Sequence, residues 1–171
     1  MAKPNLQVAL DNNTLESALA DVRAVGNIVD IVEAGTILIL QEGTIAVRAL
    51  RALFPDKIVI ADTKCADAGT TVARNMGDAG ADWMTCICAA TIPTIQAAQK
   101  EVKEKDLAKV KMLVDKGFRV SVTGGLSVDT LKLFEGVNGY TFIAGRAITQ
   151  APDPAKAATD FQNEIIRIWG K

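Results

Sequence analysis

Three ionisable side chains, Asp62, Lys64 and Asp67, lie within six residues directly after the apolar run at residues 58–61. Such a run predicts a buried strand, and alternation along a strand turns Asp62 and Lys64 toward the same side. Charges crowded at a strand end are unfavourable unless they are paired or bind a ligand. Two interpretations follow: a structural ion pair, or a site in which the carboxylates and the ammonium take part in chemistry.

Similar polar groups follow the other predicted strands. Asp11 comes after the first strand and Glu33 after the second, while Thr123-Gly124-Gly125 and Gly145-Arg146 come after the fifth and sixth. In parallel α/β folds the carboxyl ends of the strands form one rim, and ligands bind there. We therefore expect these groups to converge on one side of the molecule.

The glycine turns predict a phosphate site. Gly124 and Gly125 precede Ser127, a helix-cap residue, so bare backbone N–H groups are offered to an anion at a helix start. Gly145-Arg146 repeats the arrangement and adds a guanidinium that suits phosphate oxygens. One Gly-Gly pair is more often an ordinary turn, but two such turns on the last two strands favour a phosphorylated ligand.

The carboxylates on the other strands predict a metal centre. Glu33 and Asp62 supply hard oxygen ligands of the kind that Mg²⁺ prefers. Lys64 would stabilise oxyanion charge beside the metal. Together these groups suit a reaction of a phosphorylated small molecule that passes through an enolate or enediolate.

Apolar, β-branched runs predict six strands, at residues 6–10, 28–32, 57–61, 83–88, 118–122 and 140–144. Helical patterns lie between them, with Asn13 and Glu16 as a capping pair, Gly26 as a stop, and a last helix that starts near Pro154. This alternation indicates an α/β fold, either a barrel or an open sheet. Residues 92–117 break the rhythm, because they have helical spacing throughout and no strand.

Composition excludes several classes of protein. The 171 residues have a net charge of −1 and 5% aromatic residues, which does not suit nucleic-acid binding. No apolar stretch approaches the roughly 20 residues that span a bilayer, and the chain start does not resemble a signal peptide. Three cysteines, an odd number, indicate reduced thiols in the cytoplasm, with Cys86 and Cys88 as small core residues. The chain has no histidine, so chemistry depends on carboxylates, amines, backbone dipoles, water or metal.

At these motifs the chain resembles the 3-keto-L-gulonate-6-phosphate decarboxylases, in the suprafamily of orotidine 5'-phosphate decarboxylase and hexulose-phosphate synthase. The Asp-x-Lys-x-x-Asp motif at residues 62–67 marks the suprafamily. Five further sequence segments favour the keto-gulonate branch: residues 6–11, 32–36, 81–85, 122–126 and 142–146.

The resemblance implies a (β/α)₈ TIM barrel that forms a homodimer with shared active sites. Glu33 and Asp62 would bind Mg²⁺, Asp11 would contact the sugar, Lys64 would stabilise the enediolate, and Asp67 would reach into the partner's site. Thr123, Gly124, Gly125, Gly145 and Arg146 would match the phosphate-binding turns. The implied reaction converts 3-keto-L-gulonate 6-phosphate to L-xylulose 5-phosphate and CO₂ through a metal-stabilised enediolate, in ascorbate catabolism.

The chain departs from the family pattern between residues 89 and 117. Family members carry about two further strands there, which supply another acidic residue and the His and Arg implicated in proton delivery. We therefore expect a single barrel domain over residues 1–171 with a deletion junction near residues 103–106. A real deletion, an incomplete record of a longer chain, or protonation from bulk water each account for this difference. Two alternatives to the decarboxylase remain: a hexulose-6-phosphate synthase, and a non-catalytic phosphosugar-binding remnant.

Overall fold

Six parallel strands form the centre of the computed structural model, which describes residues 3–65, 69–86, 115 and 120–170. The order across the sheet is β4-β3-β2-β1-β6-β5. The first and last strands of the chain therefore lie side by side in the middle, as they do in a closed barrel. The strands are β1 (Asn5–Leu10), β2 (Ile31–Ala34), β3 (Ile58–Cys65), β4 (Trp83–Cys86), β5 (Ser121–Val122) and β6 (Thr141–Ala144).

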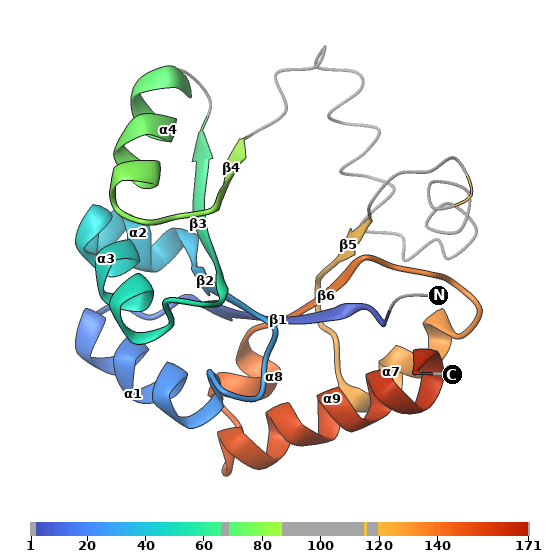
Figure 1. Cartoon of the computed structure of the whole chain (residues 1–171). Coiled ribbons are helices and arrows are strands. Elements are labelled where there is room, and N and C mark those ends of the chain that lie inside the picture. Colours follow the sequence, from blue (N-terminus) through green and yellow to red (C-terminus); the bar gives the residue numbers. More distant parts are fainter. Residues whose placement is uncertain (1–2, 66–68, 87–114, 116–119, 171) are drawn as a thin grey trace.

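The helices lie along the outside of the sheet (Figure 1). They are α1 (Leu15–Val25), α2 (Thr36–Glu42), α3 (Thr44–Leu53), α4 (Gly69–Asp78), α7 (Val128–Leu131), α8 (Arg146–Thr149) and α9 (Pro154–Trp169), with a 3₁₀ turn, η1, at Lys132–Phe134. The main core lies between sheet and helices, where Leu6 and Val8 of β1 belong to one apolar cluster with Phe161 and Ile165 of α9. Gln7, between Leu6 and Val8, faces the inside of the curl because side chains alternate along a strand.

The sheet curls into an α/β half-barrel. Trp83, at the start of β4, and Tyr140, just before β6, have ring centroids 6.2 Å apart. Because β4 and β6 lie near opposite edges of the sheet, this contact shows that the two ends of the sheet bend toward each other at the amino ends of the strands. Within the described part of the chain, β4 and β5 are the edges of the sheet and do not pair with each other.

Each strand of the structure overlaps a predicted strand, but several of the residues at which the strands begin or end differ from the prediction. β2 begins at Ile31 instead of residue 28, because Ile28 and Val29 donate backbone hydrogen bonds to Val25 in the turn after α1. β3 continues through Cys65, well beyond the predicted end at residue 61. The segments predicted as strand at residues 87–88 and 118–119 and the junction at 103–106 lie outside the described residues. So does the predicted helical segment at 92–117, apart from residue 115.

Helix caps show one correction. The N-cap of α1 is Thr14, whose hydroxyl accepts a hydrogen bond from the Ser17 N–H, and not the predicted pair Asn13 and Glu16. Gly26 ends α1 and Ser127 caps α7, both as predicted. No helix in the described ranges is both long and apolar enough to cross a bilayer.

Candidate active site

The backbone of β3 is irregular at the residues that were predicted to do chemistry. Ala61 pairs with Met84 and Cys65 pairs with Cys86, so Asp62, Thr63 and Lys64 all face the single residue Thr85 of β4. Lys64 has a φ of 43°, and among the described residues no other non-glycine residue has a positive φ. A bulge of this kind redirects side chains, and such bulges are common next to active sites.

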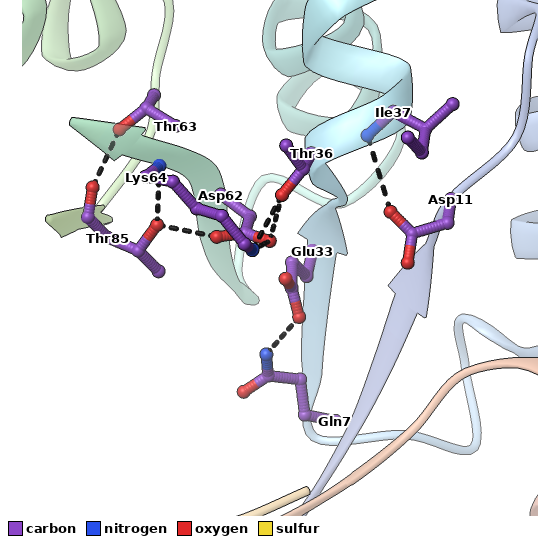
Figure 2. A network of polar contacts seen from close by, with 9 residues as sticks. All are labelled: Gln7, Asp11, Glu33, Thr36, Ile37, Asp62, Thr63, Lys64 and Thr85. Atoms are coloured by element: carbon purple, nitrogen blue, oxygen red, sulfur yellow. Dashed lines mark hydrogen bonds and ion pairs between the residues drawn. The ribbon is translucent and has the colours of Figure 1, made fainter. Parts of the chain in front are cut away.

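Asp62 and Lys64 form an ion pair, as the structural interpretation of the sequence predicted, and the pair is also compatible with a role in chemistry. The Lys64 Nζ lies 2.5 Å from the Asp62 Oδ2. Both residues lie in the bulge and Lys64 has a positive φ, so the strand is not the regular one on which the prediction was based. Figure 2 shows the Lys64 side chain folded back over Asp62.

Two threonine hydroxyls connect the partners of this ion pair (Figure 2). The Thr36 Oγ1 donates to the Asp62 Oδ2 at 2.5 Å and accepts from the Lys64 Nζ at 2.7 Å. The Thr85 Oγ1 donates to the Asp62 Oδ1 at 2.5 Å and accepts from the Lys64 backbone N–H at 3.0 Å. Burial by itself would raise the pKa of Asp62, but hydrogen bonds from Lys64, Thr36 and Thr85 lower it overall, so Asp62 is a carboxylate at neutral pH.

Glu33 is a buried acid beside this cluster. It lies on β2 and is 6% exposed, and it accepts a hydrogen bond from the Gln7 Nε2. Burial raises the pKa of Glu33 from 4.5 to about 7, and the charges of Asp62 and Asp11 add to the increase. The Gln7 hydrogen bond and the Lys64 charge oppose the increase without cancelling it. Glu33 and Asp62 lie on the neighbouring strands β2 and β3.

Asp11 lies one strand further along the rim. Its Oδ1 accepts from the Ile37 N–H at the start of α2, at 3.4 Å (Figure 2). Gly35 makes this approach possible, because a Cβ there would lie 2.7 Å from the Leu10 carbonyl oxygen and closer still to the Asp11 carboxylate. Asp11 therefore lies between the acidic cluster and the second part of the site.

The second part is a cavity of about 580 Å³ at the carboxyl ends of β1, β5 and β6. Gly124 and Gly125 have φ values of 99° and 67°, which non-glycine residues rarely adopt, so both glycines are needed for the turn. All six predicted substrate-binding residues line the cavity: Asp11, Thr123, Gly124, Gly125, Gly145 and Arg146.

The structure thus brings together Glu33, Asp62 and Lys64 on one side and the predicted phosphate turns on the other. Asp67 lies outside the described residues. Sequence reasoning did not identify Gln7, Thr36 or Thr85 as members of the site. Thr36 follows the Glu33 strand within three residues and Thr85 lies in a predicted strand, but a threonine at such positions gives no signal of its own.

The residues at the rim fit a divalent cation. Glu33 and Asp62 are hard oxygen donors, and Mg²⁺ is commonly held by one or two carboxylates with water and substrate as the other ligands. Burial raises the pKa of Glu33, and a cation bound beside it would favour the charged form. In the part of the chain that the structure describes, no group of three or more acidic, cysteine or histidine side chains is placed to share one metal ion.

Comparison with known proteins identifies the family to which this geometry belongs. The model of the orotidine 5'-phosphate decarboxylase / HUMPS family matches residues 4–116 and 96–161. This chain belongs to that family. Its half-barrel is accordingly of the TIM-barrel type. The relatives that match it include decarboxylases, which are enzymes that release CO₂ from their substrates.

Within the family, the 3-keto-L-gulonate-6-phosphate decarboxylases resemble the chain more than the hexulose-phosphate synthases do. The UlaD decarboxylase of Salmonella paratyphi B is 39% identical over 216 aligned positions, covering 99% of this chain and 100% of the relative. The structure of KGPDC from Streptococcus mutans is 52% identical with a TM-score of 0.88, covering 99% of this chain and 100% of that one. The 3-hexulose-6-phosphate synthase of Salmonella typhimurium is 29% identical with a TM-score of 0.76, covering 95% of this chain and 99% of that one.

The chain is shorter than these relatives. The alignment with UlaD has 216 positions and this chain has 171 residues, so part of UlaD has no counterpart here. The alignment nevertheless reaches across 100% of UlaD, so the residues without a counterpart lie within it.

Proposed function

We propose that the protein decarboxylates 3-keto-L-gulonate 6-phosphate to L-xylulose 5-phosphate and CO₂, a step in ascorbate catabolism. The observation that carries the proposal is the juxtaposition on one rim of the Glu33–Asp62–Lys64 cluster and the cavity lined by Arg146 and the glycine turns. A substrate held by its phosphate at the second group would extend its other end toward the first. The identity to decarboxylases in this family supports the choice of substrate.

In the proposed reaction the bond between the carboxylate carbon and its neighbour breaks, and CO₂ leaves. The electron pair stays on the sugar as an enediolate, which then takes up a proton at carbon. Lys64 carries the positive charge for the developing oxyanion, and Asp62 holds that ammonium in place through the ion pair. Asp11, next to both parts of the site, contacts the sugar hydroxyls.

Arg146 and the two glycine turns bind the phosphate in this proposal. Backbone N–H groups at Gly124, Gly125 and Gly145 donate to phosphate oxygens, and the Arg146 guanidinium neutralises the charge. Thr123 lines the same cavity. Binding at this end fixes the position of the reacting end without touching the bond that breaks, which is how binding energy lowers a barrier.

We further propose that Glu33 and Asp62 hold Mg²⁺. When bound, the ion would supply Lewis-acid stabilisation of anionic oxygen. Glu33 would then be a carboxylate at neutral pH, because a nearby cation favours the charged form.

We propose that the protein acts as a homodimer in the cytoplasm, with Asp67 reaching the partner's site. Exposed apolar side chains on α2 and α3 support the dimer: Leu40 is 75% exposed, and Ile37 and Ile45 lie near it in sequence and are also exposed. Apolar groups gathered in this way commonly mark a protein–protein interface. An odd number of cysteines, three, supports a reducing compartment.

The test is release of CO₂ from 3-keto-L-gulonate 6-phosphate in the presence of Mg²⁺. We expect turnover by the wild-type protein, a decrease in kcat of about 10²–10³-fold for Lys64→Ala, and an increase mainly in KM for Arg146→Gln. Condensation of formaldehyde with ribulose 5-phosphate, measured on the same sample, should stay at background.

Three outcomes would contradict the proposal. Aldol condensation without CO₂ release would identify a hexulose-6-phosphate synthase. Binding of the phosphosugar without turnover would identify a non-catalytic remnant. CO₂ release that persists unchanged in Lys64→Ala would show that the cluster is only a structural ion pair.

A further inference from the structure

Thr85 occupies an unusual position in the sheet. Three consecutive residues of β3 face it where a regular parallel ladder would place one. Thr85 contacts each of them: its hydroxyl meets Asp62 and the Lys64 N–H, and its carbonyl accepts from the Thr63 Oγ1 at 2.7 Å. A single residue of β4 therefore hydrogen-bonds to every residue of the bulge.

The backbone of Lys64 needs such support. A φ of 43° is sparsely populated for a side chain with a Cβ, and it persists only where the surroundings over-determine it. The Lys64 N–H has the Thr85 hydroxyl as its acceptor. Without that acceptor the positive φ would lose its support, and a change in the Lys64 backbone would move the ammonium from its present position on the Asp62 Oδ2.

The direction of the hydrogen bonds makes the hydroxyl specific. A threonine hydroxyl has one proton to donate, and the Thr85 proton goes to the Asp62 Oδ1 because the Lys64 N–H is itself a donor. The same hydroxyl thus accepts from the lysine residue and donates to the aspartate. Thr36 does the same from β2's side of the cluster, at the Asp62 Oδ2 and the Lys64 Nζ. Figure 2 shows the two hydroxyls on opposite sides of the Asp62 carboxylate.

We propose that Thr85 is a positioning residue for the reaction: through its hydroxyl it holds Lys64 in the left-handed conformation and Asp62 in the orientation that places the ammonium at the rim. It does not contact the reacting atoms. The inference rests on the proposed function for its kinetic consequence, while its geometric consequence is independent of the substrate.

Thr85→Val tests the inference, because valine has the shape of threonine and lacks the hydroxyl. In a crystal structure of this variant, we expect the φ of Lys64 to become negative and the Lys64–Asp62 ion pair to be lost. In kinetics, we expect kcat to fall about 10–100-fold, the range seen for residues that orient a primary ligand. KM should stay within about threefold, because the phosphate turns lie on other strands.

Thr85→Ser is the rescue variant, since it keeps the hydroxyl, and its kcat should stay within about threefold of the wild-type value. Thr159→Val is the matched control: the Thr159 hydroxyl donates to the Ala155 carbonyl on the exposed side of α9, and its removal should change neither kcat nor the Lys64 backbone. If Thr85→Val does not fold, Thr85→Ala removes the same hydroxyl with less bulk.

An unchanged Lys64 φ and ion pair in the hydroxyl-free variants would overturn the inference, and so would an unchanged kcat. Equal losses in Thr85→Ser and Thr85→Val would also overturn it, by assigning the effect to packing. If the wild-type protein releases no CO₂, the proposed function fails, yet the crystal structures still decide whether Thr85 positions Lys64.

Discussion

At the scale of single residues, Glu33 has the least favourable environment in the site. It is buried on β2, and its pKa of about 7 lies above the value of 4.5 expected for an exposed glutamate. The folded state therefore binds the Glu33 proton more tightly than the unfolded state does. As pH rises from about 4.5 to about 7, ionisation of Glu33 favours unfolding, and above pH 7 the full destabilisation is present.

Glu33→Gln should stabilise the metal-free protein at high pH. The amide oxygen can still accept the Gln7 hydrogen bond, but no charge is buried. We expect the free energy of unfolding of the variant, relative to wild type, to increase by about 3 kcal/mol between pH 4.5 and pH 8. Urea titrations with a chelator present measure this difference.

Addition of Mg²⁺ at pH 8 provides the control for Glu33→Gln. The wild-type protein should gain stability, because the ion binds only the folded state, and the variant should gain much less. Stability curves that stay parallel from pH 4.5 to pH 8 would contradict the assignment of a raised pKa to Glu33.

At the scale of elements, the junction between β2 and α2 connects the two parts of the site. Gly35 ends the strand that carries Glu33, and its N–H donates to the Leu10 carbonyl at the end of β1. The absence of a side chain at Gly35 lets Asp11 approach the start of α2. The spacing between the acidic cluster and the predicted phosphate turns therefore depends on how near the carboxyl end of β1 lies to the carboxyl end of β2.

Gly35→Ala should separate these elements. The added methyl group would overlap the Leu10 carbonyl oxygen and the Asp11 carboxylate, and backbone cannot move as cheaply as a flexible side chain. We expect a loss of stability of about 1–3 kcal/mol, measured by urea denaturation, together with a higher KM for the phosphosugar.

Gly77→Ala is the matched control, because Gly77 lies in α4 and a Cβ there would have no atom within 4 Å. Alanine is the better helix former by about 0.5–1 kcal/mol, so this variant should be equally or more stable. A Gly35→Ala protein as stable and as active as Gly77→Ala would show that the close approach is unimportant.

At the scale of the whole molecule, the described part is an open half-barrel with edge strands β4 and β5 and an exposed apolar group on α2 and α3. Apolar side chains exposed on neighbouring elements commonly mark a protein–protein interface, and here they support the proposed dimer. Leu40 and Ile45 are the most exposed large apolar residues of this group.

Leu40→Asp should weaken the proposed dimer, because a buried interface would have to desolvate the new charge. We expect sedimentation velocity to shift from a dimer to a monomer, with a decrease in kcat if Asp67 serves the partner's site. Leu133→Asp is the control: Leu133 is 56% exposed on η1, away from α2, and its replacement should leave the dimer intact. The same mass for both variants would argue against this interface.

Several features of the molecule followed from the sequence alone. Asp11, Glu33 and Asp62 follow apolar runs, and parallel strands end on a common rim, so their convergence depends only on topology. The glycine turn was predictable as well, because Gly124 and Gly125 mark a turn that only glycine adopts easily. Features of this kind depend only on residues that are adjacent in sequence, so the sequence predicts them.

Tertiary structure decided the details that depend on pairing between distant strands. The register of β3 against β4 places three residues opposite Thr85, and this register, which no local pattern encodes, gives Lys64 its positive φ. Thr14 replaces Asn13 as the cap of α1, since both residue types cap well and contacts such as that of the Leu15 N–H with Glu42 of α2 select one. Residue type and strand end thus predict which groups meet, whereas their orientation depends on long-range contacts that form only in the folded chain.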